Sequence, residues 1–276
     1  YARPDHERLG FSCGLDFETR IVAKPEAPAL LRKELASPKW RGETIAMSGV
    51  TDCYQPIEAK LKITRGCLEV MAECRQPVGI VTKNRLVMRD IDLLTELAGH
   101  NAARVAVSIT TLDRTLAMKM EPRASTPADR LRTIRELTDA GVPVMVMVAP
   151  IIPGLNDKEV PAILQAVKEA GAIGAGYVLL RLPFQIKALF LDWLQRQFPQ
   201  RANHIESLIR DTRDGDLYQS RFKQRQRGEG PVAEQINAMF KLFKKRYGLD
   251  QPLAPLSSAA FRPPAVDGRG QMSLFA

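Results

Sequence analysis

The sequence contains few of the residues that build disulfide frameworks or metal centres. Its 276 residues include four cysteines (Cys13, Cys53, Cys67 and Cys74) and three histidines, and no two cysteines form a C-x2-C or C-x3-C pair. Disulfide-rich folds are typical of small secreted chains, and iron–sulfur clusters usually take their ligands from a tight local set. We therefore expect no disulfide framework, and no metal cluster held by these four cysteines alone.

The chain also lacks long hydrophobic segments. It has no run of about 18 apolar residues, the length that a membrane-spanning helix requires. The charged segment PDHER near the N-terminus is unlike a secretion signal. We therefore expect a cytoplasmic protein that makes no membrane contact. With 45% apolar residues the chain can form a sizeable core, and one large domain is favoured over two.

Positive charge is in excess, with a formal net charge of +9, and it is unevenly distributed. Basic residues alternate along one short stretch and crowd a later helix: Arg221, Lys223, Arg225 and Arg227, then Lys241, Lys244, Lys245 and Arg246. Such patches occur on nucleic-acid-binding proteins, and also as solvated faces that only keep a protein soluble. We expect DNA as a partner, with the solvated face as the alternative.

Short apolar runs alternate with helical patterns, which is typical of parallel strands buried on both faces. We expect strands at 45–47, 78–81, 104–107, 142–148 and 177–180, and a sixth at 21–23. The helices expected between them cover 61–74, 90–97, 127–140 and 159–170. Gly141 and Gly171 then serve as helix C-caps. The pattern predicts an α/β fold, a partial (β/α)6 barrel of the TIM-like kind.

The pattern becomes wholly helical after residue 183. Helices expected at 186–197, 201–210 and 231–247 would cover the open side of the barrel. From residue 251 the chain is rich in Pro, Ala, Ser and Gly, which predicts a flexible tail. We therefore divide the chain into a partial barrel (1–183), a helical covering region (184–250) and a tail (251–276).

Polar residues follow the ends of the expected strands. Ser48 and Asp52 follow the strand at 45–47, and Lys83 and Ser108 lie at the ends of the next two. Asn156 follows the strand at 142–148. In parallel α/β barrels the loops after the strands form the reactive face. We therefore place the functional site there.

Six motifs carry a resemblance to a known family. They are YARP at 1–4, GLDFE at 14–18, TDCYQPIE at 51–58, IVTK at 80–83, EPR at 121–123 and PIIPG at 150–154. In combination they resemble the radical S-adenosylmethionine (SAM) proteins of the spore photoproduct lyase-like group, also labelled DNA repair photolyases. The resemblance implies a radical SAM barrel and an enzyme acting on nucleic acid. A [4Fe-4S] cluster, reduced by a flavodoxin or ferredoxin, would cleave SAM to a 5′-deoxyadenosyl radical.

The same resemblance implies where the cluster ligands lie. In that family, Tyr-Ala-Arg-Pro directly follows the last cysteine of the C-x3-C-x2-C loop. The ligands are therefore expected upstream of Tyr1, and the chain by itself is expected to be inactive. A non-catalytic, nucleic-acid-associated α/β binding module is the alternative function.

The resemblance also suggests which residues hold SAM. Lys83 and Ser108 match SAM-binding positions, where a lysine charge meets the carboxylate and a serine hydroxyl meets the carboxylate or ribose. Ser48 and Asp52 match the region that contacts the methionine end. Asp52 is equally suited to a turn, and Lys83 to a solvent-exposed strand end. Asn156 follows a segment that lies under the adenine in similar enzymes, and the same segment is a helix-capping turn.

Three further residues have two interpretations each. Glu121 and Arg123 flank a proline, and they either form an ion pair that shapes the site or leave Arg123 to meet the SAM carboxylate. Cys53 follows Asp52 directly and is either a hydrogen donor in the radical chemistry or a buried core thiol. We favour the buried core thiol. The family's donor cysteine falls at Gly49 in this chain, which puts the thymine-dimer reaction in doubt.

The last residues carry a separate resemblance. Gln271, Met272, Ser273, Leu274 and Phe275 are similar to the clamp-binding peptides of bacterial replication and repair proteins. A tail that presents two adjacent apolar residues could fill a hydrophobic pocket on a sliding clamp. A chance apolar ending is the alternative.

Overall fold

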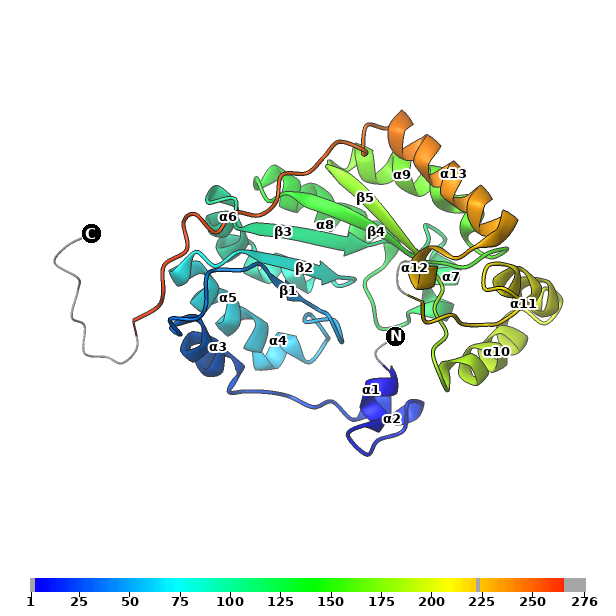
Figure 1. Ribbon diagram of the computed structural model, residues 1–276, viewed down its shortest axis with the longest axis horizontal. Helices are drawn as coiled ribbons and strands as arrows, with labels where there is room; N and C mark the ends of the chain where they lie inside the picture. Colours follow the sequence, from blue (N-terminus) through cyan, green and yellow to red (C-terminus); the bar gives the residue numbers. More distant parts are fainter. Residues whose placement is uncertain (1–2, 222–223, 266–276) are drawn as a thin grey trace.

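The computed structural model describes residues 3–221 and 224–265. Its centre is an all-parallel, five-stranded sheet in the order β1-β2-β3-β4-β5 (Figure 1). The strands span Ile45–Met47 (β1), Val78–Thr82 (β2), Ala103–Ser108 (β3), Val144–Ile151 (β4) and Gly174–Leu179 (β5). Each strand pairs with the next one in the sequence, so all carboxyl ends meet at one edge of the sheet.

Helices connect successive strands, because parallel neighbours require a crossover. The α-helices are Arg3–Glu7 (α1), Leu15–Thr19 (α2), Ala27–Leu35 (α3), Glu58–Leu61 (α4), Ile63–Cys74 (α5), Ile91–Gly99 (α6), Arg114–Met120 (α7), Pro127–Asp139 (α8), Val160–Glu169 (α9), Ile186–Gln197 (α10), Ala202–Asp211 (α11), Gln224–Arg227 (α12) and Gly230–Arg246 (α13). Short 3₁₀ helices lie at Arg85–Asp90 and Asp157–Glu159. Among the described residues, no helix combines the length and apolarity needed to cross a bilayer.

The predicted α/β class, the partial barrel and the five later strands are confirmed. Gly141 and Gly171 follow α8 and α9 with φ of +83° and +99°, as C-capping glycines do. The sixth strand predicted at 21–23 is wrong. Those residues lie in the extended link between α2 and α3, where Ile21 and Val22 are about half exposed. A short apolar run without a neighbouring strand gains no pairing and remains a loop.

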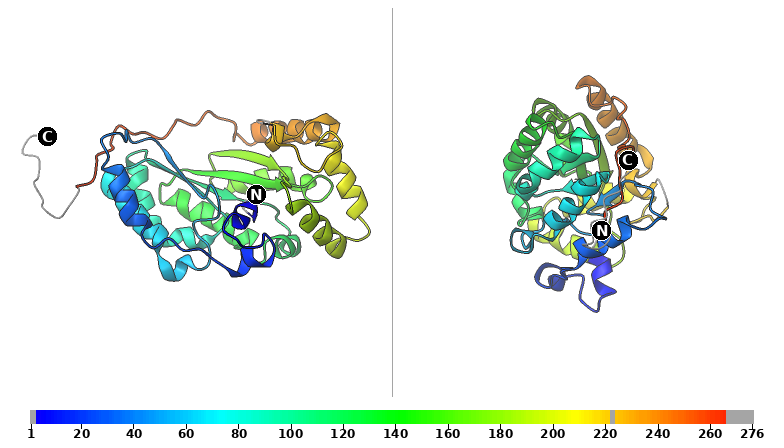
Figure 2. Two further views of the ribbon diagram at one scale, coloured as in Figure 1. Left: turned by 60° about the horizontal axis from the view of Figure 1, so that its bottom comes forward. Right: turned by 90° about the vertical axis from the view of Figure 1, so that its left-hand side faces the viewer.

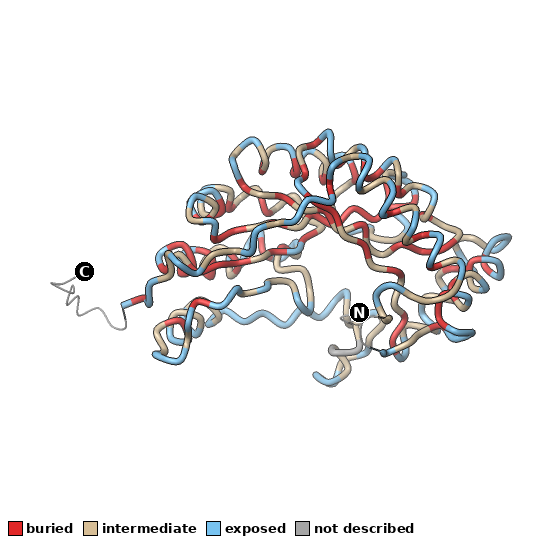
Figure 3. Tube along the Cα trace, turned by 45° about the horizontal axis from the view of Figure 1, so that its top comes forward, coloured by how far each residue is buried: buried red, intermediate tan, exposed pale blue. Residues whose placement is uncertain are grey.

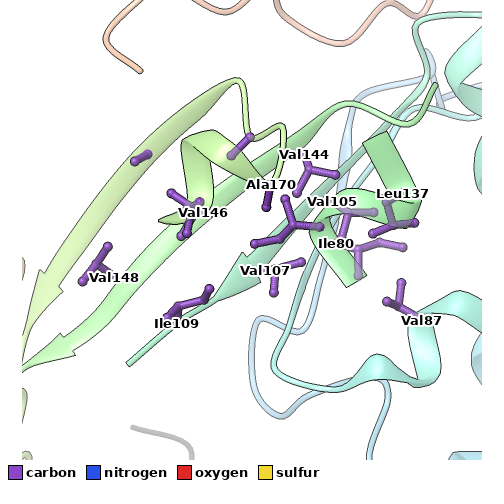
Figure 4. Close-up of a cluster of buried hydrophobic side chains, with 14 of the residues drawn as sticks. Ile80, Val87, Val105, Val107, Ile109, Leu137, Val144, Val146, Val148 and Ala170 are labelled. Carbon is purple, nitrogen blue, oxygen red and sulfur yellow. The ribbon is translucent and has the colours of Figure 1, made fainter. Parts of the chain in front are cut away.

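One face of the sheet carries the main core. Val105 and Val107 of β3 and Val144 and Val146 of β4 are buried and pack toward the helices, with Leu137 of α8 among their neighbours (Figure 4). Coloured by burial, the buried stretches concentrate in the middle of the molecule, whereas exposed stretches lie mainly on the outer helices and loops (Figure 3). The alternation in β3 and β4 matches the two-residue period of a strand with one buried face.

The opposite face of the sheet is only partly buried. Val81 on β2 is 40% exposed, Gly79 has open space where a Cβ would lie, and Met145 and Met147 on β4 are intermediate. The prediction that both faces are buried is therefore wrong for this side. Its residues are small or apolar, so the sequence resembles a fully buried sheet although one face is open.

The C-terminal helices form two groups. Helices α10 and α11 share a second apolar cluster around Ile205 and Leu194. Helix α13 packs beside α9 on the buried face of β5, where the rings of Phe240 and Tyr177 lie 4.6 Å apart (Figure 1). Helix α13 thus extends the outer helical layer beyond α9, next to β5.

Residues 251–265, predicted as the start of a flexible tail, pack along the amino ends of the strands (Figure 2). Arg104 donates to the carbonyl of Ala254, and the Ser257 amide donates to the carbonyl of Asn101 at 2.9 Å. The Arg262 amide donates to the carbonyl of Cys74 at 2.9 Å. This segment leaves the carboxyl edge of the sheet uncovered.

Candidate cofactor and active site

Hydrogen bonds join the ends of neighbouring strands at the carboxyl edge of the sheet. Asp52, in the loop after β1, accepts from the Thr82 hydroxyl at 2.9 and 3.0 Å and from the Lys83 amide at 2.8 Å. Its carboxylate also accepts from the Tyr54 amide at 2.9 Å. Asp52 therefore forms the turn that the sequence allowed and also fixes the loop after β1 to the end of β2.

A charged cluster lies at the same edge, centred on Glu121 after α7. One carboxylate oxygen of Glu121 accepts from the Lys83 ammonium and from the Thr110 hydroxyl, which is 3.0 Å away. The other oxygen accepts from Arg130 of α8 at 2.7 Å. Arg130 is 2% exposed and also donates to the carbonyl of Ser108 at 3.0 Å. Four chain segments are thereby held around one carboxylate.

The electrostatics of this cluster favour an ionised Glu121. Burial raises the pKa of Glu121, but the charges and hydrogen bonds of Lys83 and Arg130 outweigh it, so the net shift is downward. The two cations, Lys83 and Arg130, face two carboxylates at this edge of the sheet, those of Glu121 and Asp52. The Lys83 side chain remains 33% exposed. The cluster can therefore present an ammonium group to an anionic ligand.

The ion pair considered between Glu121 and Arg123 does not form. Arg123 is exposed and donates to the backbone carbonyl of Glu18, which ties the loop after α7 to α2. Its place beside Glu121 is taken by Arg130, which sequence reasoning missed. A signal for Arg130 was present, because it shares the buried face of α8 with Thr133, Ile134 and Leu137 at helical spacing. An arginine on an apolar face requires a buried partner.

Comparison with known proteins identifies the family. The profile of the Radical SAM superfamily matches residues 16–167 of the chain. The chain belongs to the radical SAM superfamily. The matched region contains β1 to β4 together with the loops that form the charged cluster.

The curated relatives of this radical SAM chain have no established activity. An uncharacterized protein of Mycobacterium tuberculosis is 36% identical over 212 residues, which is 76% of this chain and 62% of the relative. An uncharacterized protein of Methanocaldococcus jannaschii is 31% identical over 180 residues, or 65% of this chain and 64% of the relative. The chain thus spans less than two thirds of the length of these relatives.

Among solved structures, the radical SAM chain is similar to spore photoproduct lyase. A cysteine-to-serine mutant of that enzyme matches with a TM-score of 0.57 and 16% identity, over 80% of this chain and 63% of the lyase. The lyase complexed with dinucleoside spore photoproduct matches with a TM-score of 0.55 and 15% identity. At this identity the similarity concerns the fold.

The remaining predicted SAM residues lie at the same edge but differ in accessibility. Ser108 ends β3 and is 5% exposed. Asn156 is 1% exposed, and its amide donates to the carbonyls of Thr110 at 2.8 Å and Pro150 at 3.0 Å. Its side-chain oxygen accepts from the Ile152 amide at 2.7 Å. Asn156 therefore fixes the backbone between the ends of β3 and β4, and any effect on a ligand passes through that backbone.

Ser48 and Cys53 lie together in the loop after β1. The Ser48 hydroxyl accepts from the Cys53 amide at 3.0 Å, and Ser48 has a φ of +71°. Cys53 packs against the main core, and burial raises the pKa of its thiol to about 12. Its thiol is therefore protonated at neutral pH, which suits both a core residue and a hydrogen donor.

The described residues fit the two family cofactors differently. Radical SAM proteins typically use SAM together with a [4Fe-4S] cluster. Within residues 3–221 and 224–265, no group of three or more His, Cys, Asp or Glu side chains is arranged to hold a metal. Cys67 and Cys74 are buried in α5, Cys53 packs against the main core, and Cys13 lies in the loop before α2. The cysteines of this chain do not fit a cluster, whereas Lys83 and its neighbours fit the charged end of SAM.

Proposed function

We propose that the whole protein is a cytoplasmic radical SAM enzyme of the DNA repair lyase type that acts on nucleic acid. The observation that carries the proposal is the Lys83–Glu121–Arg130 cluster at the carboxyl edge of a radical SAM domain. With SAM and a [4Fe-4S] cluster bound, the cofactors supply a 5′-deoxyadenosyl radical. The residues of this chain bind and orient SAM.

Each residue of the cluster has a defined task in this proposal. Lys83 meets the SAM carboxylate, because its ammonium is partly exposed at the end of β2. Glu121 holds the Lys83 ammonium by accepting its hydrogen bond, and Arg130 fixes the Glu121 carboxylate in turn. Asp52 fixes the loop that carries Ser48 and Cys53. Preorganised charges of this kind lower the entropy that is lost when the ligand binds.

The open face of the sheet is consistent with a large substrate. Val81 and Gly79 leave the inner side of β2 accessible beside Lys83, so a base or nucleoside can approach SAM along this face. The net charge of +9 favours a polyanion. The fold is shared with a lyase that has been solved with a dinucleoside photoproduct.

The proposed partners are DNA, a reductant such as flavodoxin or ferredoxin, and a sliding clamp. The clamp segment, Gln271 to Phe275, lies outside the described residues. The binding-module alternative shares the DNA partner and differs only in lacking radical chemistry.

The test uses the complete encoded protein, purified without oxygen, supplied with iron and sulfide, and reduced in the presence of SAM. We expect 5′-deoxyadenosine to form, and UV-irradiated DNA to change its rate of formation. DNA binding without any 5′-deoxyadenosine, at full cluster occupancy, would favour the binding module. Cluster assembly on residues 1–276 alone would contradict the expected ligand position.

A further inference from the structure

Arg213, two residues after the end of α11, is a buried cation. It is 1% exposed, and its guanidinium donates to the carbonyls of Leu180 at 2.8 Å and Gln224 at 3.1 Å. Its Nε atom is buried and has no hydrogen-bond partner among the residues that the structure describes. The two carbonyls accept hydrogen bonds from some of the guanidinium N–H groups, but they are neutral and do not balance its positive charge. A buried charge normally has one.

The nearest ionisable neighbours of Arg213 do not supply that counter-charge. Arg181 follows β5, and its repulsion of Arg213 adds to burial in lowering the pKa of Arg213. Within residues 3–221 and 224–265, the Nε atom of Arg181 is also buried without a partner, and its Nη2 atom lies 3.5 Å from the Tyr218 hydroxyl. Two like charges thus lie together at the carboxyl end of β5.

No carboxylate in the part of the chain that the structure describes lies within ion-pairing distance of Arg181 or Arg213. Residues 222 and 223 are phenylalanine and lysine, so they provide no carboxylate either. The guanidinium of Arg227 from α12 lies 4.1 Å from the centre of the Tyr177 ring on β5 and adds a further positive charge to this end of the sheet. Arg181, Arg213 and Arg227 therefore concentrate positive charge around the carboxyl end of β5.

The surrounding backbone fixes these cations in place. Gly228, with a φ of +73°, follows α12, and a Cβ there would lie 2.9 Å from the carbonyl oxygen of Thr212 and 2.8 Å from Leu179. The Glu229 amide donates to the same carbonyl at 3.1 Å. The segment after α12 is therefore held tightly against the residue before Arg213 and against the end of β5.

We propose that Arg181, Arg213 and Tyr218 form a phosphate-binding site at the carboxyl end of β5, which takes a backbone phosphodiester of a nucleic acid. Arg181 and the Tyr218 hydroxyl are half-buried and contact the phosphate, while the buried Arg213 supplies charge behind them. The site deepens the proposed function because it lies at the same edge of the sheet as Lys83. Only the choice of nucleic acid as the source of the phosphate rests on that function.

The test measures fluorescence anisotropy of a labelled single-stranded oligodeoxynucleotide of about 10 nucleotides, a usual footprint for a single-strand site. The whole protein is used without SAM. We expect Arg181→Gln to weaken binding roughly 10-fold or more and to reduce the salt slope by about 0.7, the loss of one phosphate contact. The matched control is Arg132→Gln, which removes an exposed charge on α8 and should change affinity less than about 2-fold.

With a methylphosphonate oligonucleotide, whose backbone is uncharged, wild type and Arg181→Gln should bind with equal affinity. Equal binding of the phosphodiester by wild type and Arg181→Gln, or no binding by wild type, overturns the proposal. If inorganic phosphate displaces the oligonucleotide from wild type but not from Arg181→Gln, the site binds phosphate, and nucleic acid is rejected as the natural source of that phosphate. Because the assay needs no SAM cleavage, its result is independent of whether 5′-deoxyadenosine forms.

Discussion

Glu121, whose side chain is 12% exposed, and Arg213, which is 1% exposed, are both charged residues at the carboxyl edge of the sheet, but their surroundings are opposite. Glu121 lies between two cations, Lys83 and Arg130, and both of its oxygens accept hydrogen bonds from them. Arg213 lies beside another cation, Arg181, and has no carboxylate partner among the described residues. The first site is neutralised within the chain, and the second is not.

The difference indicates two kinds of task. A charge that is compensated inside the protein stabilises the fold and orients its neighbours, as Glu121 does for Lys83. A charge that is left uncompensated lowers stability until an external ion arrives. We therefore expect substitution of Glu121 itself to act mainly through stability, and substitution of Arg181 mainly through binding.

The largest expected effect follows removal of the Glu121 charge. Glu121→Gln should destabilise the fold by about 3 kcal/mol, because it leaves the buried Arg130 without its counter-charge. Glu136→Gln is the matched control, since it breaks a half-exposed pair with Arg85 and should cost about 0.5 kcal/mol. Urea unfolding measures both. Equal losses would show that the Glu121 cluster contributes no more than a surface ion pair.

The stability contribution of Glu121 should also depend on pH. Its pKa is lowered in the folded state, so it stabilises the fold above the pKa of an unfolded glutamate, about 4.3. This contribution to stability decreases as the pH falls below the pKa of the unfolded state, and it is lost once the pH has fallen through the lower pKa of the folded state. The gap in stability between wild type and Glu121→Gln should therefore narrow from pH 6 toward pH 3. A constant gap would contradict the assigned direction of the shift.

A smaller effect is expected at the other site. Arg181→Gln should change the free energy of unfolding by less than about 0.5 kcal/mol, or raise it slightly, because it removes repulsion with Arg213 and breaks no ion pair. Thermal unfolding in a buffer without phosphate or sulfate measures this. A loss as large as that of Glu121→Gln would mean that Arg181 is a structural residue.

The smallest effect on stability is expected at the C-terminus. Deleting residues 271–276 should leave the unfolding midpoint and SAM cleavage unchanged, because the hydrogen bonds that hold residues 251–265 against the sheet come from residues up to Arg262. Binding to a sliding clamp in a pull-down should be lost, since the deletion removes Leu274 and Phe275. Undiminished clamp binding would reject the clamp segment.

Much of the fold was readable from the sequence because local periodicity determines it. The helix predicted at 186–197 matches α10, and the strands after Gly141 and Gly171 follow C-caps whose positive φ glycine tolerates. The strand at 21–23 failed because strand formation depends on a neighbour that the local sequence does not reveal. The packing of residues 251–265 was missed for a similar reason, since its partners lie up to 189 residues away, as between Arg262 and Glu73.

The candidate site was only partly predictable. Strand ends identified Asp52 and Lys83, and the structure brings both together with Thr82. The pairing of Glu121 with Arg130 depends on how α8 packs against β3, so spacing alone suggested the wrong arginine. Arg213 carried no motif at all, and only its burial reveals it.

The central claim is that the Lys83 cluster holds SAM, and calorimetric SAM binding to the complete protein tests it most directly. Lys83→Ala should weaken SAM binding by roughly 1.5–3 kcal/mol, the loss typical of a hydrogen bond between charged groups, without loss of cluster iron. Lys168→Ala, which removes an exposed lysine on α9, should leave the affinity unchanged. Equal SAM affinity in wild type and Lys83→Ala would contradict the account.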